Sequence, residues 1–219
     1  MAQFLAEYLT PTKTVYSMWA IMAAVLIFAY ICTRKMETVP GPMQNIAEMA
    51  VGSLYGLIGD IMGKNTRKFF PLLGTFFIFI VVCNYSGLLP GAGELFTVPT
   101  SVLAVTAALA TIGFFAIHTS GIRKKGLGKY LLSFLKPVAF LIPITLIEQI
   151  TRPLSLALRL YGNIYGEEQV VDTLSGILAV GLPLIMQVLS LLFCLIQAII
   201  FTMLLGVFIS EAVEDEEEE

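Results

Sequence analysis

Residues 152–163, RPLSLALRLYGN, place two arginines in an apolar stretch that runs from Pro137 to Ser210. Arg152 and Arg159 are the only Lys or Arg residues after Lys136. A guanidinium within hydrocarbon costs about 2.5–3.5 kcal/mol on insertion scales, and arginine stays protonated in proteins. Because residues that carry such a cost generally serve a function, Arg159 indicates an ion pathway, a substrate site or a counter-ion.

The rest of the chain has the composition of a protein that crosses a membrane several times. Of its 219 residues, 57% are hydrophobic and 13% are charged, whereas an ordinary soluble domain is about a quarter charged. We therefore predict an all-α polytopic membrane protein with a single membrane domain over residues 1–219, and we exclude water-soluble enzymes. Cys32, Cys83 and Cys194 are dispersed in apolar stretches, which predicts neither a disulfide nor a metal site.

Three apolar segments predict upright transmembrane helices, at residues 15–33, 69–89 and 99–119. The first lacks a basic leading region and a small-residue cleavage site, so we expect a retained span. Residues 42–63 carry apolar side chains at steps of three and four, which predicts an amphipathic helix along the membrane surface. Residues 212–219 predict a solvated acidic tail.

Basic residues occupy alternate loops of this predicted topology. The loops after the first segment, before the second and after the third are cationic, while the loop at residues 90–98 has no Lys or Arg. By the positive-inside rule, the amino terminus is outside, and residues 121–136 and the carboxyl terminus are cytoplasmic.

The last third of the chain predicts two helices that are too long to stand upright, at residues 137–174 and 182–211. A helix of some 35 residues is about 50 Å long, whereas the hydrocarbon layer is about 30 Å thick. Joined by a short turn, the two helices fit as a strongly tilted antiparallel hairpin. The alternative is that the Pro and Gly residues break these stretches into upright pieces.

Each helix of the predicted hairpin carries a polar stripe. Spacings of four, seven and four residues align the first stripe, which comprises Glu148, Arg152, Arg159 and Asn163. Spacings of three, four and three align the second, which comprises Gln187, Ser190, Cys194 and Gln197. The amide oxygen of Gln197 can accept a hydrogen bond from Arg159 without neutralising its charge. Glu148 precedes Arg152 by four residues, the order that favours an ion pair.

Three acidic residues follow the first stripe: Glu167, Glu168 and Asp172. Glu168 is nine residues from Arg159, which puts it on the opposite face of a regular helix and nearer the outer end. We expect Glu168 at the mouth of an aqueous cleft, away from the cation. Glu167 and Asp172 belong either to this cleft or to a solvated turn.

Residues 152–164, RPLSLALRLYGNI, closely resemble the signature of the a subunit of F-type ATP synthases. The segments QAIIF at 197–201 and NYSGLLP at 84–90 also resemble features of this family, and the likeness covers about residues 35–212. The resemblance implies a stator subunit of the bacterial cytoplasmic (inner) membrane, with a tilted hairpin against the c-ring of the rotor. It implies the peripheral-stalk b subunits and other ATP synthase subunits as further partners.

The resemblance also implies functions for single residues. Arg159 matches the essential arginine, Asn163 and Gln197 match polar positions near it, and Glu168 matches the acid of the outer half-channel. Some members pair this acid with a histidine, whose position here is occupied by Ser190. The relay is therefore expected to use Glu168 with water, Ser190 or neighbouring acids, for which Glu167 is a possible substitute.

Together these residues predict a non-catalytic subunit that forms two offset ion half-channels and couples H⁺ or Na⁺ movement to rotation. One alternative is a self-contained secondary transporter or channel in which Arg159 binds an anionic substrate, although the chain lacks the internal repeat of many transporters. Another is a purely structural assembly subunit. Residues 59–64 lack the spacing of a phosphate-binding loop, so we expect no direct ATP binding, and no cofactor or nucleic acid is implied.

Overall fold

The computed structural model describes residues 12–34, 41–89, 96–133, 142–177 and 181–213, which form helices and short connections without a strand. The helices are α2 (Lys13–Thr33), α3 (Pro42–Met62), α4 (Thr66–Ser86), α5 (Leu103–Lys125), α6 (Leu127–Ser133), α7 (Ile142–Ile177) and α8 (Gly181–Val213), with 3₁₀ turns η1 (Gly63–Asn65) and η2 (Pro99–Ser101). The all-α prediction is confirmed. Residues 137–141 of the expected hairpin and 214–219 of the expected acidic tail lie outside the described residues.

Four stretches of the described chain are long and apolar enough to cross a membrane: Lys13–Thr33, Pro42–Ser86, Leu103–Lys125 and Ile185–Val213. Pro42–Ser86 combines α3, η1 and α4, so it includes the helix expected along the membrane surface. These stretches confirm the prediction of a polytopic membrane protein.

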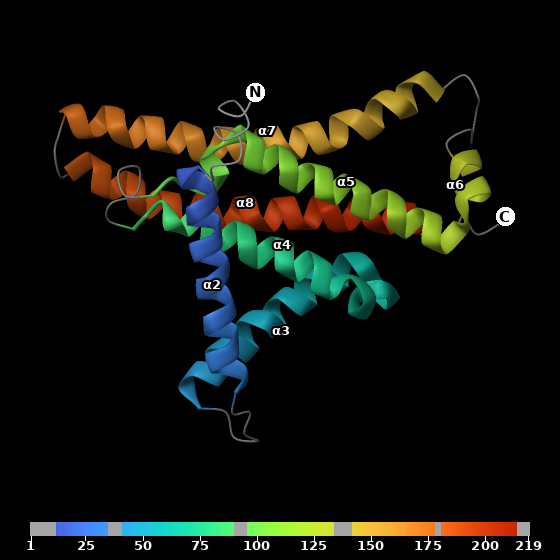
Figure 1. Cartoon of the computed structure of the whole chain (residues 1–219), viewed down its shortest axis with the longest axis horizontal. Helices are drawn as coiled ribbons and strands as arrows, with labels where there is room; N and C mark the ends of the chain where they lie inside the picture. The colour runs from blue at the N-terminus through green and yellow to red at the C-terminus, as the bar shows by residue number, and fades with distance from the viewer. Residues whose placement is uncertain (1–11, 35–40, 90–95, 134–141, 178–180, 214–219) are drawn as a thin grey trace, which may run out of the picture.

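The two longest helices, α7 and α8, lie side by side and antiparallel along the long axis of the molecule (Figure 1). Their 36 and 33 residues correspond to about 54 and 50 Å of helix, well beyond the roughly 30 Å of a hydrocarbon layer. In the same view α2 stands across this pair (Figure 1). Helix α7 is continuous from Ile142 to Ile177 although it contains Pro153.

One face of α8 lies at the centre of the bundle and contacts α3, α4, α5 and α7. Its side chains recur at helical spacing and are at most 1% exposed: Cys194, Ala198, Phe201, Leu205 and Ile209. The Phe201 ring stacks on Phe76 of α4, with centroids 6.0 Å apart. Lipid tails are as apolar as these side chains, so tight packing rather than the hydrophobic effect holds such helices together. Cys32, Cys83 and Cys194 are free and buried.

Two hydrogen bonds fasten the end of α4 to α8. The Asn84 amide nitrogen Nδ2 donates to the Cys194 carbonyl at 3.3 Å, and the Tyr85 hydroxyl donates to the Leu191 carbonyl at 3.2 Å. Both residues belong to the NYSGLLP segment. Interhelical hydrogen bonds in membranes are each worth about 0.6 kcal/mol on average, so the pair contributes modestly to stability and also sets the register of α4 on α8.

Glycines allow close approach where α6 folds back onto α5. Gly126 has φ of +80° and ends α5, which a residue with a side chain would do only under strain. A Cβ atom on Gly121 would lie 2.4 Å from the Tyr130 ring. Tyr130 of α6 is therefore seated directly on the α5 backbone.

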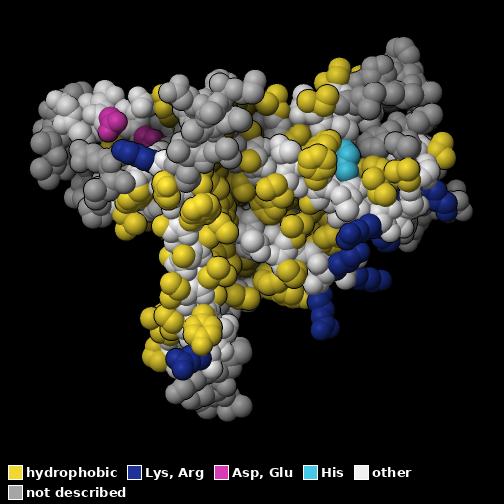
Figure 2. Space-filling view, in the orientation of Figure 1, with side chains coloured by type: hydrophobic (Ala, Val, Ile, Leu, Met, Phe, Trp, Pro, Cys, Tyr) yellow, Lys and Arg dark blue, Asp and Glu magenta, His cyan; other side chains and the backbone are white. Residues whose placement is uncertain are grey.

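Charged side chains are distributed unevenly along the molecule (Figure 2), although one basic side chain lies beside acidic ones at the hairpin end. Basic side chains gather at the end where α4 begins and α5 ends, which includes the exposed residues Lys64, Arg67, Lys68 and Arg123. Acidic side chains are visible at the other end, near the turn of the α7–α8 hairpin (Figure 2). Apolar side chains cover α2 between these regions, as is typical of a surface in contact with lipid.

Candidate functional site

Arg159 lies near the middle of α7, beside the face that packs into the bundle. Leu156, Ala157, Leu160 and Ile164 of this helix are 0–4% exposed, whereas Arg159 is exposed. Among the described residues, no ion pair or hydrogen bond involves its guanidinium. The charge is therefore not neutralised by a carboxylate of the described chain and is available to a group outside it.

An exposed apolar stripe runs along α7, turned about 100° or more around the helix from Arg159. Its members recur at three, four, four and seven residues and are 43–68% exposed: Ile147, Ile150, Leu154, Leu158 and Tyr165. The adjoining helix α8 also exposes large apolar side chains, including Ile185 and Leu192. The exposed side of α7 thus carries the permanent charge of Arg159 and, farther around the helix, an apolar surface that only lipid or another membrane helix can cover.

The second polar stripe faces inward for most of its length. Ser190, Cys194 and Gln197 of α8 are 1–6% exposed, while Gln187 is exposed. The Ser190 hydroxyl and the Gln197 amide nitrogen have no hydrogen-bond partner in the described part of the chain. The expected hydrogen bond from Arg159 to Gln197 is not formed among the described residues, because Gln197 is buried while Arg159 is exposed. Asn163 lies half-buried one turn beyond Arg159.

The α8 stripe instead meets the first of the outer acids. Glu167 follows the fully buried Leu160 by seven residues, or about two turns, so it lies on the same buried face of α7. Its carboxylate oxygen Oε2 accepts from the Cys194 thiol at 3.9 Å, and Ser190 lies beside it. Glu167 is half-buried. A carboxylate and two protic side chains therefore converge between α7 and α8.

Glu168 faces a different set of groups. It is half-buried, and its polar neighbours are Ser101 of η2, Asp172 and Glu167. Asp172 itself is exposed. The three acids thus form one cluster with two sides, in which Glu167 is directed toward α8 and Glu168 toward the turn that precedes α5.

Arg152, in the amino-terminal half of α7, connects this helix to the carboxyl end of α8. Its guanidinium donates to Glu148 at 2.8 Å and to Glu211 of α8 at 2.5 Å, and it lies 4.6 Å from the Phe208 ring centroid. The predicted Glu148–Arg152 ion pair is therefore confirmed, and Glu211 is an additional partner. Tyr130 also lies within range of Arg152. Burial raises the pKa of the Tyr130 phenol, and the nearby Arg152 charge lowers it.

Two of these neighbours were not predicted from the sequence. Glu211 is 59 residues from Arg152, and Ser101 lies in a turn before α5 with no pattern that marks it. In the sequence Glu211 stands out only as an acid at the end of a long apolar stretch. The acidic residues that follow it at 214–219 make it hard to single out. Both contacts depend on how the helices pack.

A bundle of apolar helices with one unneutralised arginine and a cluster of acids on a single long hairpin has the parts of an ion-translocating membrane subunit. The family described as ATP synthase A chain matches residues 15–210. The chain is 41% identical over 202 residues to ATP synthase subunit a 2 of Bradyrhizobium sp., a match that covers 92% of this chain and 89% of that protein.

Further relatives agree with this match. Identity is 39% over 201 residues to ATP synthase subunit a of Moorella thermoacetica, covering 92% of this chain and 90% of that protein. It is 35% over 224 residues to ATP synthase subunit a of Geotalea daltonii, covering 97% and 96%. The chain belongs to the family of a subunits of F-type ATP synthases, which confirms the resemblance seen in residues 152–164.

Proposed function

We propose that this chain, a membrane-sector subunit of an ATP synthase, forms two offset ion half-channels against the c-ring and couples H⁺ or Na⁺ translocation to rotation. The observation that carries the proposal is Arg159, an exposed guanidinium without a carboxylate partner among the described residues, on a helix that also exposes an apolar stripe. Such a surface suits a ring of apolar helices that presents one carboxylate after another.

The function of Arg159 in this proposal is electrostatic. A positive charge within a few ångströms favours the ionised form of a carboxylate. A rotor carboxylate that arrives at Arg159 therefore releases its ion toward the cytoplasmic half-channel. The same charge repels cations and so blocks a direct leak between the two half-channels. Arginine suits this function because its guanidinium stays protonated and its planar group presents several N–H donors in a fixed arrangement.

The outer half-channel in this proposal is built on Glu167, Glu168, Asp172 and Ser190. Ions enter from outside at the exposed Asp172 and pass through the half-buried pair Glu167 and Glu168. Ser190 is buried beside the Glu167 carboxylate and has no other polar partner among the described residues, so its hydroxyl can bond either to that acid or to a water molecule or an ion. Glu167 is the acid with contacts to Ser190 and Cys194, so in this proposal it transfers the ion toward α8.

Asn163 and Gln197 supply polarity near the cation in this proposal. Asn163 is one turn beyond Arg159 on α7, and the buried Gln197 amide has an unused donor among the described residues. In this proposal, a small rotation of either helix, or the arrival of the rotor, allows these amides to form hydrogen bonds near Arg159. Amides can hydrogen-bond to Arg159 or to water without cancelling the charge.

The proposed orientation puts the amino terminus outside and the carboxyl terminus in the cytoplasm of a bacterium, with the chain in the inner membrane. The support is the gathering of Lys and Arg at one end of the described molecule, because positive charge is enriched on the cytoplasmic side. The lengths of α7 and α8 support a strongly tilted hairpin. The peripheral-stalk b subunits are proposed as further partners, and ATP is proposed to bind elsewhere in the complex.

The test uses the assembled complex in sealed vesicles under an imposed ion gradient. Arg159→Ala is expected to abolish coupled ATP synthesis, and Arg159→Lys to restore only part of it, because the charge returns without the fork. Arg123→Ala, at the exposed end of α5, is the matched control and is expected to synthesise ATP normally. Full synthesis by Arg159→Ala contradicts the proposed function, as does ion transport by the purified chain alone, which is the behaviour of a self-contained transporter.

A further inference from the structure

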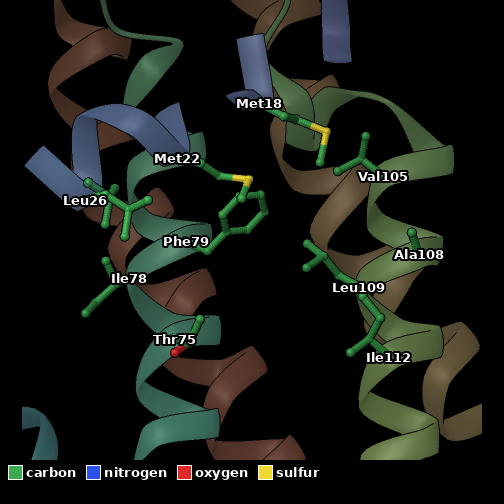
Figure 3. Close-up of a pocket in the computed structure, with 11 residues that line it drawn as sticks. Met18, Met22, Leu26, Thr75, Ile78, Phe79, Val105, Ala108, Leu109 and Ile112 are labelled. Atoms are coloured by element: carbon green, nitrogen blue, oxygen red, sulfur yellow. The ribbon is translucent and has the colours of Figure 1, made fainter. Parts of the chain in front are cut away.

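Helix α5 presents two faces to the bundle, and each leads to different basic residues at its carboxyl end. One face lines an apolar groove of about 500 Å³ with α2 and α4, in which Figure 3 shows Leu109 and Ile112 on the same side. Arg123 follows Ile112 by eleven residues, or about three turns, so it continues this groove face. The other face contains the buried glycines Gly113 and Gly121.

The glycine face packs against α8 in a definite register. A Cβ atom on Gly113 would lie 3.1 Å from the Leu205 side chain, and one on Gly121 would lie 3.2 Å from the Ala212 carbonyl oxygen. Residue numbers rise together at the two contacts, because α5 and α8 run parallel (Figure 1). The glycines are eight residues apart and their α8 neighbours are seven apart, so the two helices advance almost equally toward their carboxyl ends.

Two lysines continue the α8-facing side of α5 beyond its last contact. Lys124 and Lys125 follow Gly121 by three and four residues, which places them within about 60° of it around the helix. Arg123 lies about 160° from Gly121. Lys124 is exposed and Lys125 is partly exposed. The two lysines therefore stand on the side of α8, and the arginine stands on the side of the groove.

An acidic run begins at the level of these lysines. Val213, which is 1% exposed, is the last residue of α8 that the structure describes, and residues 214–219 read EDEEEE. An advance of four residues leads from Gly121 to Lys125, and the same advance from Ala212 leads into this run. Six residues reach at most about 20 Å, whereas Lys125 is only about 6 Å of helix beyond Gly121.

Electrostatics favours a contact between the run and the lysines. Negative charge after the carboxyl end of a helix is unfavourable next to the helix macrodipole, and neighbouring carboxylates repel one another. Nearby cations offset both effects. Among the described residues no carboxylate forms an ion pair with Lys125, and Glu211, the described acid that is nearest to the run in sequence, pairs with Arg152.

We propose that the acidic segment at residues 214–219 binds the face of α5 that carries Lys124 and Lys125, and that this contact holds the carboxyl end of α8 against α5. The partner of this basic surface is thus the chain's own acidic segment. The contact is separate from Arg159 and from the outer acids, and it does not depend on the direction or the identity of the transported ion.

Zero-length cross-linking tests the contact in the assembled complex in lipid nanodiscs, because a water-soluble carbodiimide joins a lysine amine directly to a carboxylate. Mass spectrometry is expected to find Lys124 or Lys125 joined to residues 214–219. Arg123→Lys is the matched control, since it places an amine in the same turn on the groove face. Position 123 is expected to give at least about fivefold less product, which corresponds to about 1 kcal/mol of preference.

The salt dependence and the identity of the products decide the outcome. Raising the salt from about 0.01 M to about 1 M shortens the Debye length from about 30 Å to about 3 Å, so the yield at Lys124 and Lys125 is expected to fall severalfold. An equal yield at position 123 overturns the proposal, as does a yield that salt does not change. Products that join these lysines mainly to another subunit overturn it, and so does the absence of products, which is the result if lipid headgroups cover the lysines.

Hydrogen exchange tests whether the contact holds the end of α8. The double variant Lys124→Gln, Lys125→Gln removes both charges, and the backbone amides of residues 209–213 are expected to exchange about three- to fivefold faster, as for the loss of two exposed ion pairs. Arg123→Gln removes a charge from the same turn on the groove face and is expected to leave this exchange unchanged. Equal exchange in the double variant and the unaltered complex overturns the proposed hold on α8.

Discussion

Breaking the contact of Arg152 with Glu211 is expected to loosen α7 from α8. Arg152 is 24% exposed and Glu211 is 50% exposed, so solvent screens the pair and its worth is about 0.5–1 kcal/mol. The cation–π contact with Phe208 at 4.6 Å adds about 0.5–1 kcal/mol. Glu211→Gln should therefore cost about 0.5 kcal/mol of unfolding free energy, and Arg152→Gln about 1.5 kcal/mol, since the latter loses both ion pairs and the ring contact.

A double-mutant cycle isolates the contact between the two helices. Arg152→Gln, Glu211→Gln and the double variant are compared by steric-trap unfolding in lipid bicelles, and a coupling energy of about 0.5–1 kcal/mol is expected. Glu148→Gln is the matched control, because Glu148 pairs with Arg152 within α7 and does not touch α8 through this pair. A coupling energy of zero between Arg152 and Glu211 refutes the reasoning.

The same contact has a functional consequence under the proposed mechanism. Arg152 is seven residues, or about two turns and 10 Å, from Arg159, so the rotation of α7 that Arg152 sets also sets the direction of Arg159. Passive ion leak through the complex is expected to rise in Glu211→Gln and not in Glu148→Gln. Identical leak in the two variants would show that the contact is structural only.

Three further changes test the packing and the acids. Gly121→Ala drives a Cβ into the Tyr130 ring and should destabilise the chain by about 1–3 kcal/mol, read as a lower unfolding midpoint; an unchanged midpoint contradicts the packing. Asn84→Ala removes the hydrogen bond to the Cys194 carbonyl and should lower the free energy of unfolding by about 0.6 kcal/mol. An unchanged free energy of unfolding in the same assay contradicts this expectation. Glu167→Gln should slow ATP synthesis more than it changes stability, and an unchanged rate would exclude Glu167 from the ion route.

The fold class followed from the sequence because apolar length is a local signal. Runs of some twenty apolar residues predict helices in a membrane whatever surrounds them, and the described helices agree. The Glu148–Arg152 pair was equally local, since four residues bring two side chains onto one face of any helix. Helix periodicity also placed Ser190, Cys194 and Gln197 on one face of α8, and all three are buried.

Contacts between helices were not accessible in the same way. The α8 stripe was expected to meet Arg159, but its Cys194 meets Glu167, because the register of α7 against α8 depends on how the buried side chains of both helices pack, Leu160 and Phe201 among them. The partnership of Arg152 with Glu211 depends on the same register. A single sequence gives no information about which distant positions come into contact. The faces of α7 and α8 could therefore be predicted, but the alignment of one helix along the other could not.

The central claim is that the exposed side of α7, which carries both Leu158 and Arg159, lies against the rotor ring. A photoreactive benzophenone side chain at Leu158, which is 49% exposed next to Arg159, tests it in the assembled complex, with Phe28 of α2, 51% exposed, as the control position. The account predicts a covalent adduct between position 158 and the ring subunit and none between position 28 and the ring. Adducts of position 158 with lipid alone, or with any subunit other than the ring, would contradict it.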